Sequence, residues 1–460
     1  MAIDLTPRFK DFAVYLPALQ NQYATAVRSD STRDKTRAFP TNLKMTDLDF
    51  LNPKSKLWHY GYGLYSAGQF SGFSNKPCAV TNRDRDNTVI LGDSGGFQIG
   101  KGTLNGTKHF NKAKTSAEVC EMWRNSRDIP KWIVNWLETH SDYAMTIDMP
   151  LWAKFPSNKD TPFHKCSIDE LIELSVENLD FINFNQRGNT KWLSVLQGID
   201  AKDSLQWWNA VKKYKFSGWA LAGNVGWRGG LENVLRYVML IRDDNGFSKK
   251  QEWMHVLGVS QPIWAVLLTQ IQRSIRIHCK NPNFRVSYDS ASPFQLGGRY
   301  QRVARYPKYG KRLDSWVMGA HEAPINPIYA KDKQRYQFPY PSPLGDLMSN
   351  NELNWNGQFN KKVPLDSIGG HMLTNHNLFV FVRSMLEANE LTFMHSSEAD
   401  KAVPQPLIDC IAFIDDLFTD ANWEKRLKSE KKLIDSLFNN STKLVKDNFA
   451  TYEEEEMRYE

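Results

Sequence analysis

An alternation of strand-like and helix-like segments constrains the fold of this 460-residue chain more than any other feature. The strand-like segments are apolar and rich in β-branched residues, and they lie at 89–91, 143–149, 192–198, 218–223, 255–259 and 284–288. Helical patterns fill the intervals at 116–139, 167–184, 202–214, 229–242 and 261–279. Strands that alternate with helices indicate parallel βαβ units.

Two observations decide which parallel architecture to expect. At least six such strands follow one another, and a further strand-like segment covers residues 12–16. No GxGxxG phosphate-binding turn follows the first strand, which disfavours an open dinucleotide-binding sheet. The pattern therefore predicts an α/β protein with a (β/α)8 TIM-like barrel, insertions and a C-terminal helical extension.

The chain divides into three predicted regions. Residues 1–298 are expected to form the barrel and catalytic core, and residues 299–365 a basic and aromatic insertion. Residues 366–460 are expected to hold the last barrel helix and a helical extension that ends in an acidic tail. A polar stretch near the N-terminus, with Arg28, Arg33, Lys35 and Arg37, is interpreted as a solvated loop.

Composition excludes several classes of protein. With 41% hydrophobic and 24% charged residues the chain is an ordinary globular protein. It has no run of about 18 apolar residues, so no membrane span is expected, and its first residues lack the features of a signal peptide. Five scattered cysteines outside any CxxC pair favour reduced thiols and a cytoplasmic location. The net charge of +7 permits an anionic partner without requiring one.

Three aspartates fall at or just beyond the ends of predicted strands: Asp93, Asp148 and Asp289. A single such aspartate is most often a helix cap or turn residue. Since the carboxyl ends of barrel strands meet at one mouth, three in equivalent places favour a shared pocket, with Gln197 and Gly223 at two further strand ends. Paired carboxylates suit glycosidic-bond chemistry.

One competing interpretation concerns Gly92–Gly96, a GDSGG string that also surrounds the nucleophilic serine of trypsin-like proteases. Only His59 precedes it, so the histidine and aspartate partners of such a serine are missing in the required order. The serine-protease interpretation is therefore rejected, and Ser94 is expected to do no covalent chemistry.

Together these segments resemble the tRNA-guanine transglycosylase superfamily, whose members exchange guanine for a 7-deazaguanine in nucleic acid. Asp93–Gln98 resembles the family's DSGG(Y/F)Q motif, and Tyr288–Pro293 resembles its FD(C/S)VxP segment. Four segments between these two motifs stand in the order found in the family: Ile147-Asp148, Leu196-Gln197-Gly198, Leu221–Asn224 and His255–Val259. The last of them is similar to a YLMGVG strand. The likeness covers about residues 88–293.

The resemblance implies a role for each of these residues. Asp289 would be the nucleophile that attacks C1′, and Asp93 the general acid and base. Asp148, Gln197 and Gly223 would recognise the base, with Phe97 and Leu257 above and below it. Leu257 stands where the family often has methionine.

The chain departs from the family at its structural zinc site, which consists of a CxCxxC motif and a histidine. Only Cys410 lies beyond Asp289, and His376 alone matches the histidine position. One ligand cannot hold zinc, so we expect neither zinc nor any other cofactor.

The substrate expectation follows from that loss. Family relatives in phages and bacterial genomic islands resemble this pattern and place 7-deazaguanines in DNA, which protects it from restriction. The predicted contact is a basic run with interleaved tyrosines, whose charged residues are Arg299, Arg302, Arg305, Lys308, Lys311 and Arg312. DNA and a free 7-deazaguanine base, such as 7-cyano-7-deazaguanine, are the expected partners, in the host cytoplasm if the protein is phage-encoded.

Three alternatives remain open from the sequence. The chain could be a tRNA enzyme that has lost its zinc, a glycosylase that removes a base without replacing it, or a non-catalytic accessory subunit. Retention of both Asp93 and Asp289 argues against the accessory subunit. The sequence leaves homodimer formation open.

Overall fold

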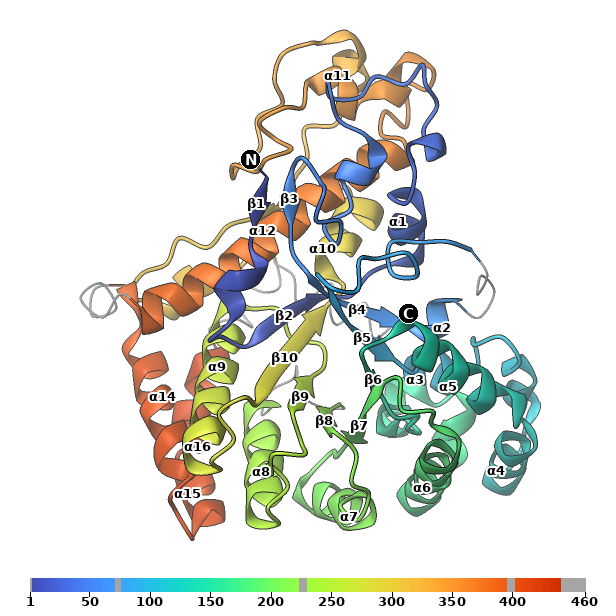
Figure 1. The fold of residues 1–460 in the computed structure, drawn as a ribbon, viewed down its shortest axis with the longest axis vertical. Coiled ribbons are helices and arrows are strands. Elements are labelled where there is room, and N and C mark those ends of the chain that lie inside the picture. Colours follow the sequence, from blue (N-terminus) through green and yellow to red (C-terminus); the bar gives the residue numbers. More distant parts are fainter. Residues whose placement is uncertain (1, 71–75, 223–229, 395–401, 440–460) are drawn as a thin grey trace.

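A computed structural model describes residues 2–70, 76–222, 230–394 and 402–439. Its centre is an eight-stranded parallel sheet that closes into a barrel (Figure 1). The strands are β2 (Val14–Pro17), β4 (Tyr62–Ser66), β5 (Val89–Asp93), β6 (Tyr143–Met145), β7 (Lys191–Leu196), β8 (Gly218–Leu221), β9 (Trp253–Val256) and β10 (Arg285–Ser290). The predicted α/β barrel is confirmed.

The barrel closes between its first strand and both of its neighbours. β2 pairs in parallel with β10, Tyr15 opposite Tyr288. On its other side, Ala18 forms a parallel bridge with Leu64 of β4, and the Leu19 amide donates to the Leu64 carbonyl over 2.9 Å. Each of these eight strands therefore has two neighbours, and the barrel leaves no edge exposed to pair with another chain.

Helices follow the strands and cover the outside of the barrel. They are α3 (Gly96–Lys101), α4 (Ser116–Asn125), α5 (Asp128–His140), α6 (Ile168–Asn185), α7 (Ala201–Val211), α8 (Gly230–Asp243), α9 (Pro262–His278) and α12 (Ser367–Phe393). The single helix predicted at 116–139 is two helices. Pro130 explains the restart, because a residue without an amide hydrogen fits the first turn of a new helix.

β4 was not predicted. Its sequence, Tyr62-Gly63-Leu64-Tyr65-Ser66, mixes aromatic and small residues instead of β-branched ones, although all five are buried. The short helix α2 (Ala67–Phe70) follows it directly. The N-terminal strand expected at 12–16 is confirmed as β2, displaced toward its carboxyl end.

The N-terminal segment packs on α12, with the helix α1 (Asn21–Ala26) and the strand pair β1 (Ile3–Asp4) and β3 (Trp58–His59). The Asn375 side chain of α12 donates to the Leu48 carbonyl over 2.9 Å and accepts from the Trp58 indole over 3.3 Å. In Figure 1 this blue segment lies beside the orange residues that precede α12.

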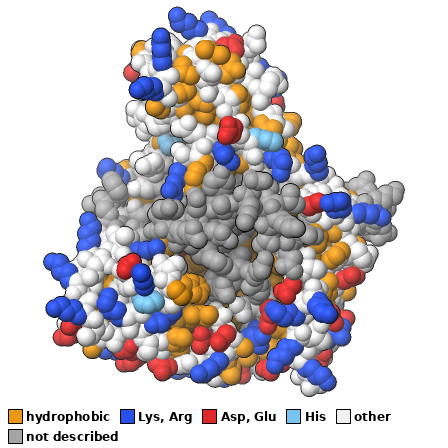
Figure 2. All heavy atoms as spheres, turned by 180° about the vertical axis from the view of Figure 1, so that it is seen from behind, with side chains coloured by type: hydrophobic (Ala, Val, Ile, Leu, Met, Phe, Trp, Pro, Cys, Tyr) orange, Lys and Arg blue, Asp and Glu red, His pale blue; other side chains and the backbone are white. Residues whose placement is uncertain are grey.

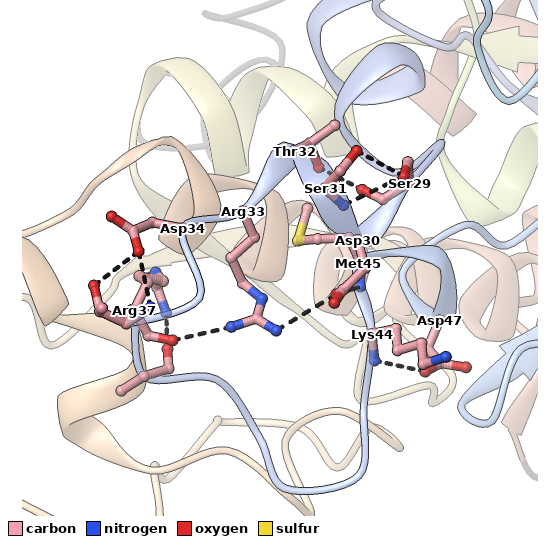
Figure 3. A network of polar contacts seen from close by, with 12 residues as sticks. Ser29, Asp30, Ser31, Thr32, Arg33, Asp34, Arg37, Lys44, Met45 and Asp47 are labelled. Atoms are coloured by element: carbon pink, nitrogen blue, oxygen red, sulfur yellow. Dashed lines mark hydrogen bonds and ion pairs between the residues drawn. The ribbon is translucent and has the colours of Figure 1, made fainter.

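The polar stretch at 28–47 is more ordered than the solvated loop that the sequence suggested. Arg33 donates to the Arg37 carbonyl and to Asp30, whose carboxylate also accepts from the Met45 amide (Figure 3). Arg37 is 4% exposed and grips Asp366 with two nitrogens, at 2.7 and 3.0 Å. The interpretation of Arg37 as a solvated residue was wrong, because an arginine this buried requires an anionic partner.

Beyond β10, the chain forms α10 (Ser292–Phe294), the antiparallel hairpin β11 (Arg302–Arg305) and β12 (Gly319–Glu322), and α11 (Asn350–Leu353). After α12 come α14 (Gln405–Leu417), α15 (Trp423–Ser429) and α16 (Lys431–Asn439), which Figure 1 shows beside α8 and α9. Across the described ranges, no helix has the length and apolar character needed to cross a bilayer. The predicted acidic tail lies outside the described residues.

Candidate active site

The three predicted carboxylates lie at the carboxyl-terminal mouth of the barrel. Asp93 is the last residue of β5, Asp289 is the next-to-last residue of β10, and Asp148 follows β6 by three residues. All three are half-buried. Strand ends of a closed barrel face one cavity, so a ligand at the mouth can meet all three.

The turn after β5 is shaped by a close backbone approach. Gly95 has a φ of 84°, and a Cβ there would lie 2.8 Å from the Cα of Gly68 in α2. Only glycine fits such a left-handed and crowded position. The next glycine, Gly96, faces Asp148, with 3.3 Å between the site of its missing Cβ and Asp148 Oδ1. The motif thus joins β5, α2 and Asp148 at one point.

Ser94 lies inside this turn with no exposed surface. Its hydroxyl has no hydrogen-bond partner among the described residues, and no histidine contacts it there. A nucleophilic serine needs both an adjacent base and access to substrate, so the geometry agrees with the rejection of the protease interpretation.

Asp289 is held by two donors on one oxygen. Its Oδ1 accepts from the Gly258 amide at 3.0 Å and lies 3.1 Å from Nε2 of His255. Its Oδ2 has no hydrogen-bond partner in the described part of the chain, and 13% of the side chain is exposed. One carboxylate oxygen is therefore anchored while the other is available to a ligand.

Burial raises the pKa of Asp93 above its ordinary value, and the negative charge of Asp289 raises it further. Burial likewise raises the pKa of Asp148 to about 7, with a second contribution from Asp93. A carboxyl group with a raised pKa is suited to give and take protons during a reaction.

Gln197 is 1% exposed and fully engaged by its surroundings. Its amide nitrogen donates to the Asp148 carboxylate and, over 3.1 Å, to the Met149 carbonyl, while its oxygen accepts from the Leu151 amide at 2.8 Å. Gln197 thus orients Asp148. Asp148 Oδ1 makes no hydrogen bond to a described residue and is the group of this pair that can face a base.

The predicted stacking residues lie on two sides of the mouth. Phe97 in α3 is half-buried, and its ring centroid is 5.1 Å from that of Trp152. The Lys101 ammonium lies 5.4 Å from both rings. Leu257 follows β9, half-buried against the core. Gly223 lies outside the described residues.

The basic run does not form a single exposed strip. Arg299, Lys308, Lys311 and Arg312 are exposed, whereas Arg302 and Arg305 on β11 are half-buried. Arg302 pairs with Glu322 at 3.7 Å, and Arg312 pairs with Asp314. On the face seen in Figure 2, Lys and Arg side chains are spread over the surface instead of gathering in one patch.

The tyrosines of this run have structural partners. Tyr306 donates to Glu387 and stacks on Tyr340 with centroids 4.1 Å apart, and Tyr309 donates to the Ser384 carbonyl at 2.5 Å. These two rings pack against α12 and are not presented for stacking on nucleic-acid bases.

The surroundings of His376, the single match to the family's zinc ligands, do not suit a metal. His376 Nδ1 lies 2.8 Å from the Ser342 hydroxyl, and Phe338 stacks on its ring at 3.8 Å. Burial lowers the pKa of His376 to about 3, so the ring is neutral. Within the described ranges no three His, Cys, Asp or Glu side chains gather closely enough to hold an ion. His376 is therefore held by a hydroxyl and an aromatic ring.

Comparison with known proteins gives one informative similarity. Over 186 aligned residues the chain is 24% identical to the queuine tRNA-ribosyltransferase of Chlamydia abortus (strain DSM 27085 / S26/3). The aligned region covers 38% of this chain and 49% of that enzyme. The chain thus spans about half the length of the curated relative. The similarity supports a distant relationship to the tRNA-guanine transglycosylase superfamily. No protein-family model matches the chain.

Sequence reasoning missed three contributors to the site. His255 lies inside a family-like segment in which only Leu257 was assigned a role, and strand pairing places it beside Ser287 of the next strand. Gly258 has a φ of 72° and supplies a backbone donor, which no side-chain motif reveals. Trp152 beside Phe97 lies in a short 3-10 helix, Leu151–Lys154, that no sequence pattern indicated.

Proposed function

We propose that this protein is a transglycosylase that exchanges guanine for a 7-deazaguanine in DNA. The observation that carries the proposal is the pair of unlike carboxylates at one barrel mouth: Asp289, anchored through one oxygen, and Asp93, whose pKa is raised. The similarity to a queuine tRNA-ribosyltransferase supports the same chemistry.

In the first step, Asp289 Oδ2 attacks C1′ of the target nucleoside. The bond from C1′ to guanine N9 breaks, its electron pair leaves with the base, and Asp93 supplies a proton to the departing guanine. A covalent ester between Asp289 and the sugar remains.

In the second step, N9 of the incoming deazaguanine attacks C1′ and Asp93 accepts its proton. The ester bond breaks and Asp289 leaves as a carboxylate. Two displacements at one carbon retain the configuration, and no nucleotide cofactor is required because one glycosidic bond replaces another.

Base selection is assigned to the residues around Asp148. Its Oδ1 would accept from the amino and imino edge of guanine while Gln197 fixes its orientation. Phe97 and Leu257 would cover the two faces of the base, and a target in duplex DNA would be flipped into the mouth. Gly223 is retained as a backbone contact from the sequence motif.

DNA is preferred to tRNA because the chain lacks the metal-ligand set of the tRNA enzymes and has an aromatic contact at His376 instead. The exposed Lys308 and Lys311 would contact the phosphate backbone. A tRNA substrate is the second candidate, favoured by the similarity to a tRNA-ribosyltransferase.

The deciding experiment incubates the protein with labelled 7-cyano-7-deazaguanine and either DNA or unmodified tRNA, followed by nucleoside mass spectrometry. Label in DNA supports the proposal, label in tRNA alone assigns the tRNA activity, and abasic sites without label indicate a glycosylase. No reaction with either nucleic acid is the result expected of an accessory subunit.

The nucleophile is tested by Asp289→Ala. We expect wild-type protein to form an adduct with nucleic acid that survives denaturing electrophoresis, and the variant to form none, because the attacking oxygen is gone. If Asp289→Ala still traps nucleic acid, the assignment of Asp289 is wrong.

A further inference from the structure

A chain of hydrogen bonds behind Asp289 leads away from the mouth into the barrel. The Trp253 indole nitrogen lies 2.7 Å from the Ser287 hydroxyl, and the same hydroxyl lies 2.8 Å from Nδ1 of His255. Nε2 of His255 then lies 3.1 Å from Asp289 Oδ1. His255 and Ser287 are fully buried, so water does not compete for the two bonds that the Ser287 hydroxyl makes.

The direction of each bond follows from Trp253, the one partner that can act only as a donor. An indole nitrogen can only donate, so the Ser287 oxygen accepts from Trp253. The single hydroxyl hydrogen of Ser287 is then free to donate to Nδ1 of His255. Since Nδ1 accepts, the ring proton is on Nε2, which donates to Asp289 Oδ1.

The arrangement also opposes a second proton on the ring. A protonated His255 would donate from Nδ1 to a Ser287 oxygen that already accepts from Trp253. The hydroxyl hydrogen would then need another acceptor, and the described residues offer Ser287 no further partner. A buried donor without a partner is costly.

We propose that His255 is a positioning residue that decides which oxygen of Asp289 attacks. Its Nε2 hydrogen, together with the Gly258 amide, fixes Oδ1 and leaves Oδ2 as the nucleophile. The ring thus acts as a fixed donor to one oxygen of the carboxylate. This inference rests on the proposed function and assigns within it a residue that no motif singled out.

Both displacements gain from this arrangement. The two donors restrict rotation of the carboxylate before attack, which favours a reactive geometry. In the ester, Oδ1 becomes the carbonyl oxygen, and as the sugar leaves for the incoming base the same donors receive the returning negative charge. Donors placed where charge develops lower the barrier.

Three variants distinguish the hydrogen bond that His255 donates to Asp289 from the packing of its ring. His255→Leu keeps an apolar side chain but removes the donor, and we expect adduct formation to slow about 100-fold, as for the loss of one fixed donor. His255→Gln keeps an amide nitrogen in reach of Oδ1 and should recover most of that loss. Ser287→Ala keeps the ring but frees its tautomer, with an intermediate effect on rate and little on substrate affinity.

A second histidine in the chain provides the control. His376 lies 2.8 Å from Ser342 through Nδ1, as His255 does from Ser287, but faces Phe338 instead of a carboxylate. His376→Gln should leave the adduct rate within about twofold of the wild type, because no reacting group depends on its ring. Equal losses for His376→Gln and His255→Leu would mean that buried histidines matter only for folding, which would overturn the proposal.

Nitrogen NMR of the free, 15N-histidine-labelled protein tests the hydrogen-bond chain without any activity. The signal that disappears in His255→Gln should report a neutral ring with its proton on Nε2 at neutral pH, and Ser287→Ala should shift it toward a mixture. A proton on Nδ1, or an imidazolium, overturns the assignment, as does an unchanged adduct rate in His255→Leu. Absence of any adduct in the wild type removes the catalytic role together with the proposed function, while the NMR result still decides the tautomer.

Discussion

At the scale of single residues, the mouth separates three chemically identical carboxyl groups by their surroundings. Asp289 receives two donors on one oxygen, Asp93 lies half-buried near the negative charge of Asp289, and Asp148 lies half-buried against the Gln197 amide. Donors stabilise the ionised form, whereas burial and like charge stabilise the protonated form. A nucleophilic carboxyl group has to be ionised, whereas a proton carrier has to be able to hold a proton, and these different surroundings favour the two different states.

The raised pKa of Asp148 predicts a pH dependence of stability. The folded pKa is about 7 against an ordinary value of 3.8. Between these values the unfolded chain loses the proton and the folded protein keeps it, so ionisation opposes folding increasingly as the pH rises, by at most about 1.4 kcal/mol per pH unit. Asp148→Asn removes this group.

We therefore expect the free energy of unfolding of Asp148→Asn, relative to wild type, to increase between about pH 4 and pH 7 and to level off above, as the two pKa values of this group require. Urea titrations at acidic, intermediate and slightly alkaline pH measure it. A difference that is constant over this range would show that Asp148 is not protonated in the folded protein.

At the scale of elements, the turn after β5 depends on α2. Gly95 combines a φ of 84° with a Cβ position 2.8 Å from Gly68 Cα, whereas Gly188 has a φ of 79° and open space around it. Gly188→Ala should lose only the conformational contribution, about 1–2 kcal/mol. Gly95→Ala adds a backbone clash and should lose at least about 1 kcal/mol more. Equal losses, measured by chemical denaturation, would mean that α2 moves aside freely.

The start of α12 depends on the N-terminal segment. Asp366 caps the helix through the Gly369 amide at 2.8 Å and is also gripped by buried Arg37. Arg37→Ala leaves this carboxylate without its counter-ion, and we expect a loss of about 3 kcal/mol. Exposed Lys35→Ala is the matched control, expected within about 0.5 kcal/mol of wild type. If thermal unfolding shows the same stability for both variants, the ion pair between Arg37 and Asp366 does not stabilise the fold.

Helices and strands were predictable from the sequence where the hydrophobic periodicity and the segment length indicated the same type of element. The helices at 168–185 and 262–278 and strand β7 lie within a few residues of their predicted positions. β4 was missed because its residues carry no β-branched pattern, and β6 ends at Met145 instead of the predicted residue 149. For the site, Asp93 and Asp289 were predictable from strand ends, while His255 and Gly258 required the register of neighbouring strands.

At the scale of the whole molecule, the net charge of +7 gives a measurable prediction for nucleic-acid binding. Exposed Lys308 and Lys311 form no ion pair with a described residue, so they are free to replace counterions on phosphates. Lys308→Glu with Lys311→Glu should flatten the dependence of log K on log salt by about 0.7–0.9 for each phosphate that is no longer neutralised. The same change at exposed Lys425 and Lys428 of α15 is the control. If both pairs flatten the slope equally, binding does not use the basic run.

The closure of the barrel has a consequence for how the protein is made. β2 leaves the ribosome before the other seven strands of the barrel, yet its partner β10 follows about 275 residues later, the separation between Tyr15 and Ser290 across the seam. Until then β2 has an unsatisfied edge, and pairing over such a distance is slow to form. The strand that completes the barrel also carries Asp289. A nascent chain can therefore display Asp93 and Asp148 but lacks Asp289 until translation has passed β10, so the three carboxylates meet at one mouth only when the barrel is complete.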